Sequence, residues 1–234
     1  MTSPGIRLLP LVATAMLASP LVHAYDAGDL ILRAGVAVVD PQDSSGNVRV
    51  GATELDGWEV NVDSNRQLGL TASYLVSDHF GVGLLAATPF KHNISGDGAA
   101  LNGAGKLAET KHLPPTLTLQ YFPLASGSTV QPYLGIGVNY TNFFEEETTP
   151  TLTGALGADR STIELDDSIG LAAELGVDIA LDERFGFNAA IWWADIDTEA
   201  TIKGYDSAGN LKATGKVDVD IDPLVYMLGF TYRF

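Results

Sequence analysis

The sequence predicts an all-β protein, a single eight-stranded antiparallel transmembrane β-barrel with long extracellular loops and short periplasmic turns. Eight segments alternate apolar with polar or small residues, and strand side chains alternate with a period of two. Long and short connections also alternate between these segments, as they do in outer-membrane barrels. The chain ends on the aromatic-rich segment 224–234, which is typical of strands that meet the membrane interface.

The first 24 residues have the layout of a secretory signal peptide, with Arg7, an apolar run and a small-residue cleavage site ending at Ala24. A membrane-spanning helix is the alternative. Pro10 and Pro20 interrupt the apolar run, which is shorter than the roughly 20 residues that such a helix needs. We therefore expect residues 1–24 to be removed and residues 25–234 to form one outer-membrane domain.

The composition excludes several classes of function. The formal net charge of −16 disfavours nucleic acid as a partner, because nucleic acid requires a basic surface. The chain has no cysteine, so its stability does not come from disulfides. No nucleophile elbow and no phosphate-binding loop is present in the sequence.

The expected strands follow one another along the whole mature chain. They span about 29–39, 67–76, 80–90, 111–122, 133–141, 168–179, 185–193 and 224–234. The long connections are expected to be polar loops at about 40–63, 91–110, 143–164 and 200–215. The third loop holds the acidic run 145–147 and is compatible with a little helix.

Alternation divides each strand into a lipid face and a lumen face. We expect the lipid face to include Leu70, Leu117, Ile136, Leu171 and Ile191. We expect the lumen face to include Gly69, Thr118, Asn139, Glu174 and Trp192. A soluble up-and-down barrel would place the apolar face inside, but the signal peptide, the loop asymmetry and the aromatic terminus together favour the membrane.

Several short segments resemble the OmpW family of small outer-membrane proteins, which includes OprG and the alkane-associated AlkL proteins. The segments are 84–92 (LLAATPFKH), 112–117 (HLPPTL), 132–140 (PYLGIGVNY), 192–198 (WWADIDT) and 232–234 (YRF). The resemblance covers essentially the whole mature chain, in order and at matching spacings.

The resemblance implies a narrow, largely hydrophobic channel for passive uptake of small hydrophobic molecules, with lateral release into the membrane. It places the channel constriction at Leu85 and Trp192, although both side chains could simply fill the interior of a small barrel. Pro114 and Pro115 remove two backbone donors from the fourth strand. The pair marks either a lateral opening or only a strand start at the rim. A polar lower lumen with solvated Glu174 and Asp178 would favour the lateral route.

Catalysis, metal binding and cofactors are not expected. His92 and His112 flank one loop and could approach each other, but two histidines are weak evidence for zinc, and we expect solvated rim residues. The acidic run 145–147 and the aspartates Asp218, Asp220 and Asp222 could attract divalent cations at the lipopolysaccharide surface, although such runs are more often solvated loop faces. A structural or adhesive barrel without a conducting role is the alternative function, and a lipid-editing enzyme would need the two histidines.

The expected partners follow from the location in the outer membrane. They are small hydrophobic solutes, outer-membrane lipid and lipopolysaccharide. The terminal Phe234 resembles the carboxyl-terminal signature that the barrel assembly machinery recognises.

Overall fold

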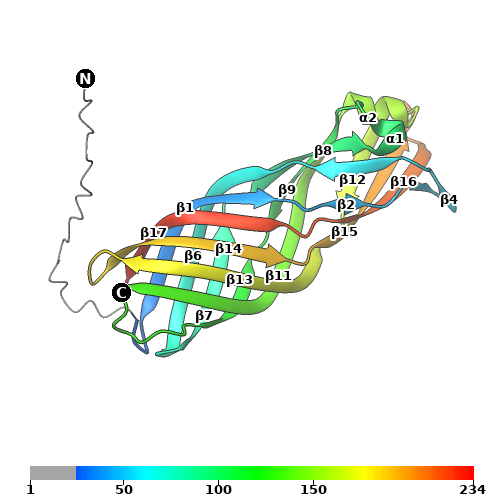
Figure 1. Ribbon diagram of the computed structural model, residues 1–234. Helices are drawn as coiled ribbons and strands as arrows, with labels where there is room; N and C mark the ends of the chain where they lie inside the picture. The colour runs from blue at the N-terminus through cyan, green and yellow to red at the C-terminus, as the bar shows by residue number, and fades with distance from the viewer. Residues whose placement is uncertain (1–24) are drawn as a thin grey trace, which may run out of the picture.

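A computed structural model describes residues 25–234, and the predicted signal peptide at 1–24 lies outside the described residues. Eight strands form the barrel in Figure 1. They are β1 (Leu30–Asp40), β6 (Asn65–Ser77), β7 (Phe80–Ala87), β10 (Thr116–Tyr121), β11 (Val130–Thr148), β13 (Ser168–Ala180), β14 (Phe185–Ala194) and β17 (Leu224–Arg233). The predicted eight-stranded antiparallel barrel is confirmed.

The barrel closes because every barrel strand pairs with an antiparallel neighbour on both sides. β10 pairs with β11, which joins the two ends of the strand order, and β1 pairs with β17, so the first and last strands lie side by side. Gly35 and Gly229 face each other in this last pair. A Cβ atom on Gly35 would lie 2.1 Å from the carbonyl oxygen of Leu228. The absence of a side chain on Gly35 therefore permits the close approach of β1 and β17.

The two faces of the strands follow the predicted alternation. Leu70, Leu117, Ile136 and Leu171 are exposed on the outside and Ile191 is half-buried. The predicted lumen residues Gly69, Thr118, Asn139, Glu174 and Trp192 are all buried. Because the outer face is apolar and the inner face is largely polar, the inside-out pattern of a membrane barrel is confirmed.

The long extracellular connections are confirmed, but most of their residues form further strands above the barrel, which the sequence did not predict. One sheet continues from β11 through β9 (Lys106–Leu113), β8 (Phe90–Asp97) and β5 (Glu59–Val62). A second sheet contains β12 (Arg160–Leu165), β15 (Asp197–Tyr205) and β16 (Leu211–Asp220), with β2 (Ser44–Ser45), β3 (Arg49–Val50) and β4 (Thr53–Glu54) at its edge. α1 (Gly98–Leu101) and α2 (Pro150–Ala155) cap this extracellular extension, and α2 fits the little helix considered for 143–164.

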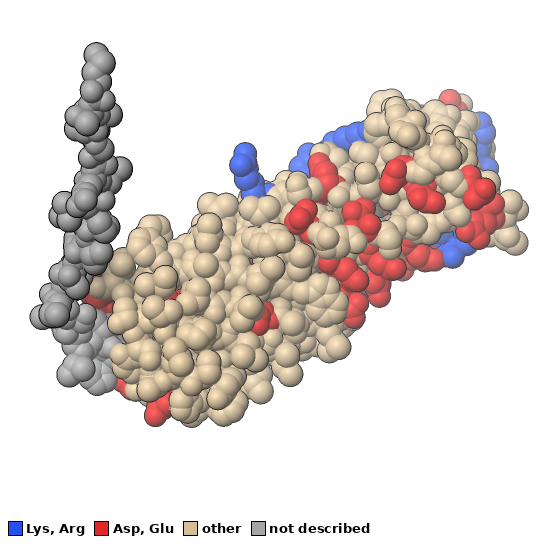
Figure 2. All heavy atoms as spheres, viewed as in Figure 1, with Lys and Arg blue, Asp and Glu red and all other residues tan. Residues whose placement is uncertain are grey.

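The strands of the extension are difficult to recognise in the sequence because their outward residues are polar. On β8, Phe90, His92 and Ile94 point inward, while Lys91 and its outward neighbours face water. The outward positions of a strand in water are polar, whereas those of a strand in lipid are apolar. The sequence of an extracellular strand therefore resembles that of a polar loop. Figure 2 shows the same division, with charged residues gathered over the extension and few over the barrel.

Among the described residues, no helix is long and apolar enough to cross a membrane.

Candidate functional site

The extracellular extension encloses an apolar cavity of about 40 Å³ between its two sheets. Val60 on β5, Ile94 on β8 and Leu107 on β9 line one side, and Ile202 on β15 and Val217 on β16 line the other. All five side chains are buried and belong to one hydrophobic cluster. The packing of inward residues from both sheets thus builds an apolar chamber above the barrel.

His92 and His112 are buried in the wall of this chamber, so the expectation of solvated rim residues is wrong. They are 1% and 3% exposed, and their ring centroids lie 4.8 Å apart. The physical reason is that β8 and β9 continue the barrel upward, and both positions fall on the inward side of that hairpin. The sequence had indicated only that the two histidines could approach each other, which is confirmed.

Burial changes the protonation of the two histidines, which lie above the apolar band of the barrel. Desolvation, with a smaller contribution from nearby His92, lowers the pKa of His112 from 6.5 to about 3. Desolvation also lowers the pKa of His92, against the opposing effect of the backbone carbonyl and charge of Asp63. Both imidazoles are therefore neutral at pH 7 in the folded protein.

We predict that the protein loses stability as the pH falls from 6.5 towards 3. In this window unfolded His112 binds a proton that folded His112 does not, so the unfolded state is favoured, by at most about 1.4 kcal/mol for each pH unit and each proton. Urea unfolding in lipid vesicles at pH 7.5 and pH 5, compared with that of His112→Phe, measures this effect. An identical pH dependence in the variant would contradict the prediction.

Leu85 and Trp192 lie together in an apolar plug below the chamber. Their side chains are 8% and 3% exposed. They form one buried cluster with residues from β1, β17 and the start of β8. The other members are Ala37, Val39, Phe90, Val225 and Met227. The structure therefore brings the two predicted constriction residues together at the level where the barrel meets the extension.

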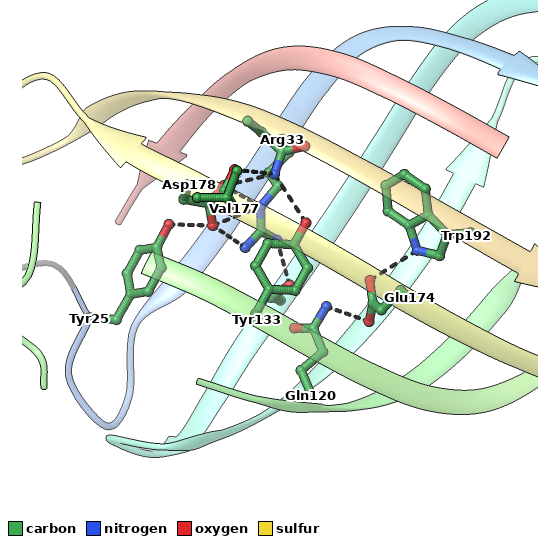
Figure 3. Close-up of polar contacts among 10 residues, drawn as sticks. Tyr25, Arg33, Gln120, Tyr133, Glu174, Val177, Asp178 and Trp192 are labelled. Atoms are coloured by element: carbon green, nitrogen blue, oxygen red, sulfur yellow. Dashed lines mark hydrogen bonds and ion pairs between the residues drawn. The ribbon is translucent and has the colours of Figure 1, made fainter. Parts of the chain in front are cut away.

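Glu174 on β13 fixes the lower side of this plug. The Nε1 of Trp192 donates a hydrogen bond of 2.9 Å to Oε2 of Glu174, and the Nε2 of Gln120 donates one of 2.8 Å to Oε1 (Figure 3). Oε1 also accepts a hydrogen bond of 2.5 Å from the Oγ1 of Thr118. Glu174 is 6% exposed, so the expectation that its carboxylate is solvated is wrong. The carboxylate orients the indole and joins the apolar plug to the polar half of the lumen.

A second polar network fills the lower lumen around Arg33 and Asp178 (Figure 3). The Nη2 of Arg33 lies 2.5 Å from Oδ2 of Asp178, and both side chains are buried. Tyr25 donates to the same carboxylate at 2.6 Å, and the guanidinium lies 4.6 Å from the ring centre of Tyr133. Asp178 is thus paired and dry, contrary to the expectation of a solvated lower lumen.

Alternation along the first strand puts Arg33 on the lumen side but suggests no role for it. A charged side chain at an inward position of a membrane strand indicates a buried ion pair, because a buried charge requires a partner of opposite charge. Asp178 occupies an inward position of β13, so the two opposite charges could have been matched. Their distance depends on barrel closure, which alternation along single strands does not give.

Pro114 and Pro115 interrupt the fourth barrel strand, as predicted. β9 ends at Leu113 and β10 begins at Thr116. On one side, Thr116 pairs with Leu85 of β7 and His112 pairs with Phe90 of β8. Between these two pairs, residues 113–115 have no partner in the described strands on that side. On the other side, the nitrogen of Tyr140 donates to the carbonyl of Pro115. The backbone pairing of the barrel wall is therefore interrupted on one side of residues 113–115 and maintained on the other.

A smaller cavity of about 20 Å³ connects these features. Pro114, Leu85 and Trp192 all line it, and His112 lines both this cavity and the larger chamber. Pro115 is exposed on the outer surface. The apolar plug, the wall break and the floor of the chamber therefore meet at one level of the molecule.

The acidic residues lie on the outside, as predicted. Glu145 is on the outer part of β11, where Lys111 contacts it, and Asp218 and Asp220 are exposed on β16. Carboxylates of Asp195, Asp197 and Asp222 approach within 4.8 Å of one another where the barrel meets the extension. Such a cluster alone does not identify a ligand.

Comparisons with known proteins identify relatives along the whole described chain. The model of the OmpW family matches residues 26–234. Outer membrane protein W of Vibrio cholerae serotype O1 is 44% identical over 224 residues, covering 96% of this chain and 97% of that protein. The dibenzothiophene metabolism operon protein PahQ of Pseudomonas aeruginosa is 26% identical over 193 residues, covering 82% of each chain.

The structural comparison gives the same picture. The crystal structure of the outer membrane protein OprG from Pseudomonas aeruginosa matches with a TM-score of 0.82 and 47% identity. The match covers 91% of this chain and 99% of that chain. These relatives are named as outer-membrane proteins or for an operon, and none of the three is named as an enzyme.

Proposed function

Because this chain belongs to the OmpW family and is an outer-membrane β-barrel, we propose that it takes up small hydrophobic molecules passively and releases them sideways into the membrane. The solute enters the apolar chamber of the extension, reaches Leu85 and Trp192, and leaves through the wall at Pro114 and Pro115. The name of the relative PahQ refers to the metabolism of dibenzothiophene, an apolar compound. That name supports the class of solute.

The observation that carries the proposal is the contrast between the two halves of the lumen. The chamber above is lined by apolar side chains, whereas Arg33, Asp178 and Glu174 below are buried and paired. An apolar solute moving down the axis would have to separate these pairs, and removing a buried charge from its partner costs about 3–5 kcal/mol. Moving from the chamber into lipid keeps the solute in apolar surroundings throughout.

The Leu85 and Trp192 plug acts in this proposal as the floor of the chamber. Glu174 holds the indole of Trp192 in place by one hydrogen bond. The floor turns the solute toward Pro114, which lines the same small cavity. We assign the constriction to Leu85 and Trp192 and the lateral opening to Pro114 and Pro115.

We predict that Pro114→Ala combined with Pro115→Ala slows uptake. The two new backbone N–H groups allow the ladder to continue across the break, which narrows the opening. Uptake of an alkane or a terpene-like compound by cells carrying the variant should fall severalfold, while a gel-shift assay shows a folded barrel. Pro123→Ala, in the turn below β10, is the matched control and should leave uptake unchanged.

Normal uptake in the folded double variant would contradict the lateral route. The alternative function, a structural or adhesive barrel, predicts that deleting the whole protein also leaves uptake unchanged. The two results are distinguishable, because a plain axial pore would lose uptake on deletion and keep it in the double variant.

Two further partners are proposed on the basis of exposure. Phe234 is 66% exposed and its ring centroid lies 4.6 Å from that of Tyr232, so the terminal aromatic is accessible to the barrel assembly machinery. The acidic outer surface of the extension is placed to meet lipopolysaccharide through divalent cations. The signal peptide at 1–24 is proposed to be removed before assembly.

A further inference from the structure

The chamber lining is apolar except at two histidines and two threonines. The Nε2 atoms of His92 and His112 are buried and have no hydrogen-bond partner among residues 25–234. The two threonines are already used, since Thr110 donates to the carbonyl of Lys111 and Thr198 donates to that of Asp166. Buried polar atoms are normally hydrogen-bonded, so two unpartnered nitrogens in the wall of one cavity point to a ligand.

The backbone fixes the tautomer of His92. Its Nδ1 lies 2.5 Å from the carbonyl oxygen of Asp63, and a carbonyl only accepts hydrogen bonds, so Nδ1 carries the proton. In a neutral imidazole the other nitrogen is then an acceptor. The Nε2 of His92, a residue that lines the chamber, therefore has an unused lone pair and requires a donor.

His112 can supply the opposite function. It packs between the rings of Phe90 and Phe143, at centroid distances of 5.6 and 5.7 Å. No polar side chain of the described residues engages its Nε2, so this nitrogen is able to carry a proton and donate. The pair then presents one acceptor and one donor with their rings 4.8 Å apart.

We propose that His92 and His112 bind the hydroxyl group of an otherwise apolar solute. The hydroxyl donates its hydrogen to Nε2 of His92 and accepts a hydrogen bond from Nε2 of His112. The inference rests on the proposed uptake function and names its preferred substrates, which are small alcohols. A ketone of the same shape lacks the donor, and a hydrocarbon lacks both groups.

The size of the chamber fits such a group. A volume of about 40 Å³ is several times the roughly 10–15 Å³ that one water molecule requires. The space therefore accepts a hydroxyl with a few attached carbon atoms, and His112 also lines the cavity that leads to Pro114. Water is the competing occupant, because it also both donates and accepts.

The test uses three small compounds of similar shape, butan-2-ol, butan-2-one and 2-methylbutane. Each is titrated into the full barrel in nanodiscs, and binding is followed by the imidazole nitrogen resonances, with empty nanodiscs correcting for partition into lipid. We expect butan-2-ol to shift the Nε2 resonance of His92 and to bind about tenfold more tightly than butan-2-one, the order expected for one hydrogen bond to a buried partner. His92→Leu should abolish that preference.

His79→Leu is the matched control, because His79 lies in the periplasmic turn and contacts the carbonyl of Phe122. This variant should keep the preference for butan-2-ol. If His92→Leu does not fold, the resonance shift in the unaltered protein still decides the question. Equal binding of all three compounds, or a His92 resonance that butan-2-ol leaves unchanged, overturns the hydroxyl site while uptake by the chamber stands. If none of the three binds, the proposed uptake function fails as well.

Discussion

Replacing Asp178 with leucine is expected to lower the free energy of unfolding by about 3–5 kcal/mol, the range for breaking a buried ion pair by removing one partner. Among residues 25–234, the variant leaves the guanidinium of Arg33, whose side chain is fully buried, with Ser73 as its hydrogen-bond partner and the ring of Tyr133 beside it. Urea unfolding in lipid vesicles measures the change.

A double variant separates the cost of an unpaired charge from the cost of altered packing. Arg33→Leu combined with Asp178→Leu removes both charges and should recover much of the lost stability, because hydrophobic replacements of a buried pair are often neutral. Asp218→Leu is the matched control. Its partner is Arg49 at the exposed surface, and no measurable change is expected. A single variant as stable as the unaltered protein would contradict a tightly paired lower lumen.

Replacing Trp192 with alanine is expected to raise uptake of bulky apolar solutes relative to small ones by about tenfold, the order for removing a bulky group from an apolar pocket. The indole lines the small cavity beside Pro114, and its loss enlarges the space in front of the wall break. The measurement compares uptake of a two-ring and a one-ring hydrocarbon by the same cells. Some stability is lost too, about 3–5 kcal/mol for a buried tryptophan.

Phe187 provides the control for this experiment. It lies on the outer face of β14 and is 45% exposed, so Phe187→Ala removes an aromatic side chain from the lipid side and leaves the small cavity unaltered. The ratio of the two uptake rates should not change. If Trp192→Ala and Phe187→Ala have the same effect, Trp192 only packs and does not limit the solute.

The membrane-spanning part of the fold could be predicted from the sequence, because lipid demands apolar residues at every outward position. Strand β13 is the clearest case, with Ile169 and Leu171 outside and Glu174 inside. The extracellular strands could not be recognised in the same way. On β8 the outward Lys91 faces water, so only the inward residues distinguish this strand from a polar loop.

The candidate site shows the same limit. Alternation placed Leu85 and Trp192 on the lumen side, and the two prolines indicated a weak point in the wall. Alternation does not say which inward residues of distant strands meet across a closed barrel. The Arg33 to Asp178 pair and the bonds to Glu174 depend on that closure, and the burial of His92 and His112 depends on the unrecognised hairpin of β8 and β9.

Reversible closure of the wall break tests the lateral route most directly. The chain contains no cysteine, so Ala86→Cys with Pro115→Cys introduces the only thiols, both at outward positions beside the break. Phe80→Cys with Tyr121→Cys, paired at the lower end of β7 and β10, is the matched control. A cleavable thiol cross-linker should stop uptake of an apolar solute in the first variant only, and cleavage should restore it. Uptake that continues with the break cross-linked would contradict lateral release.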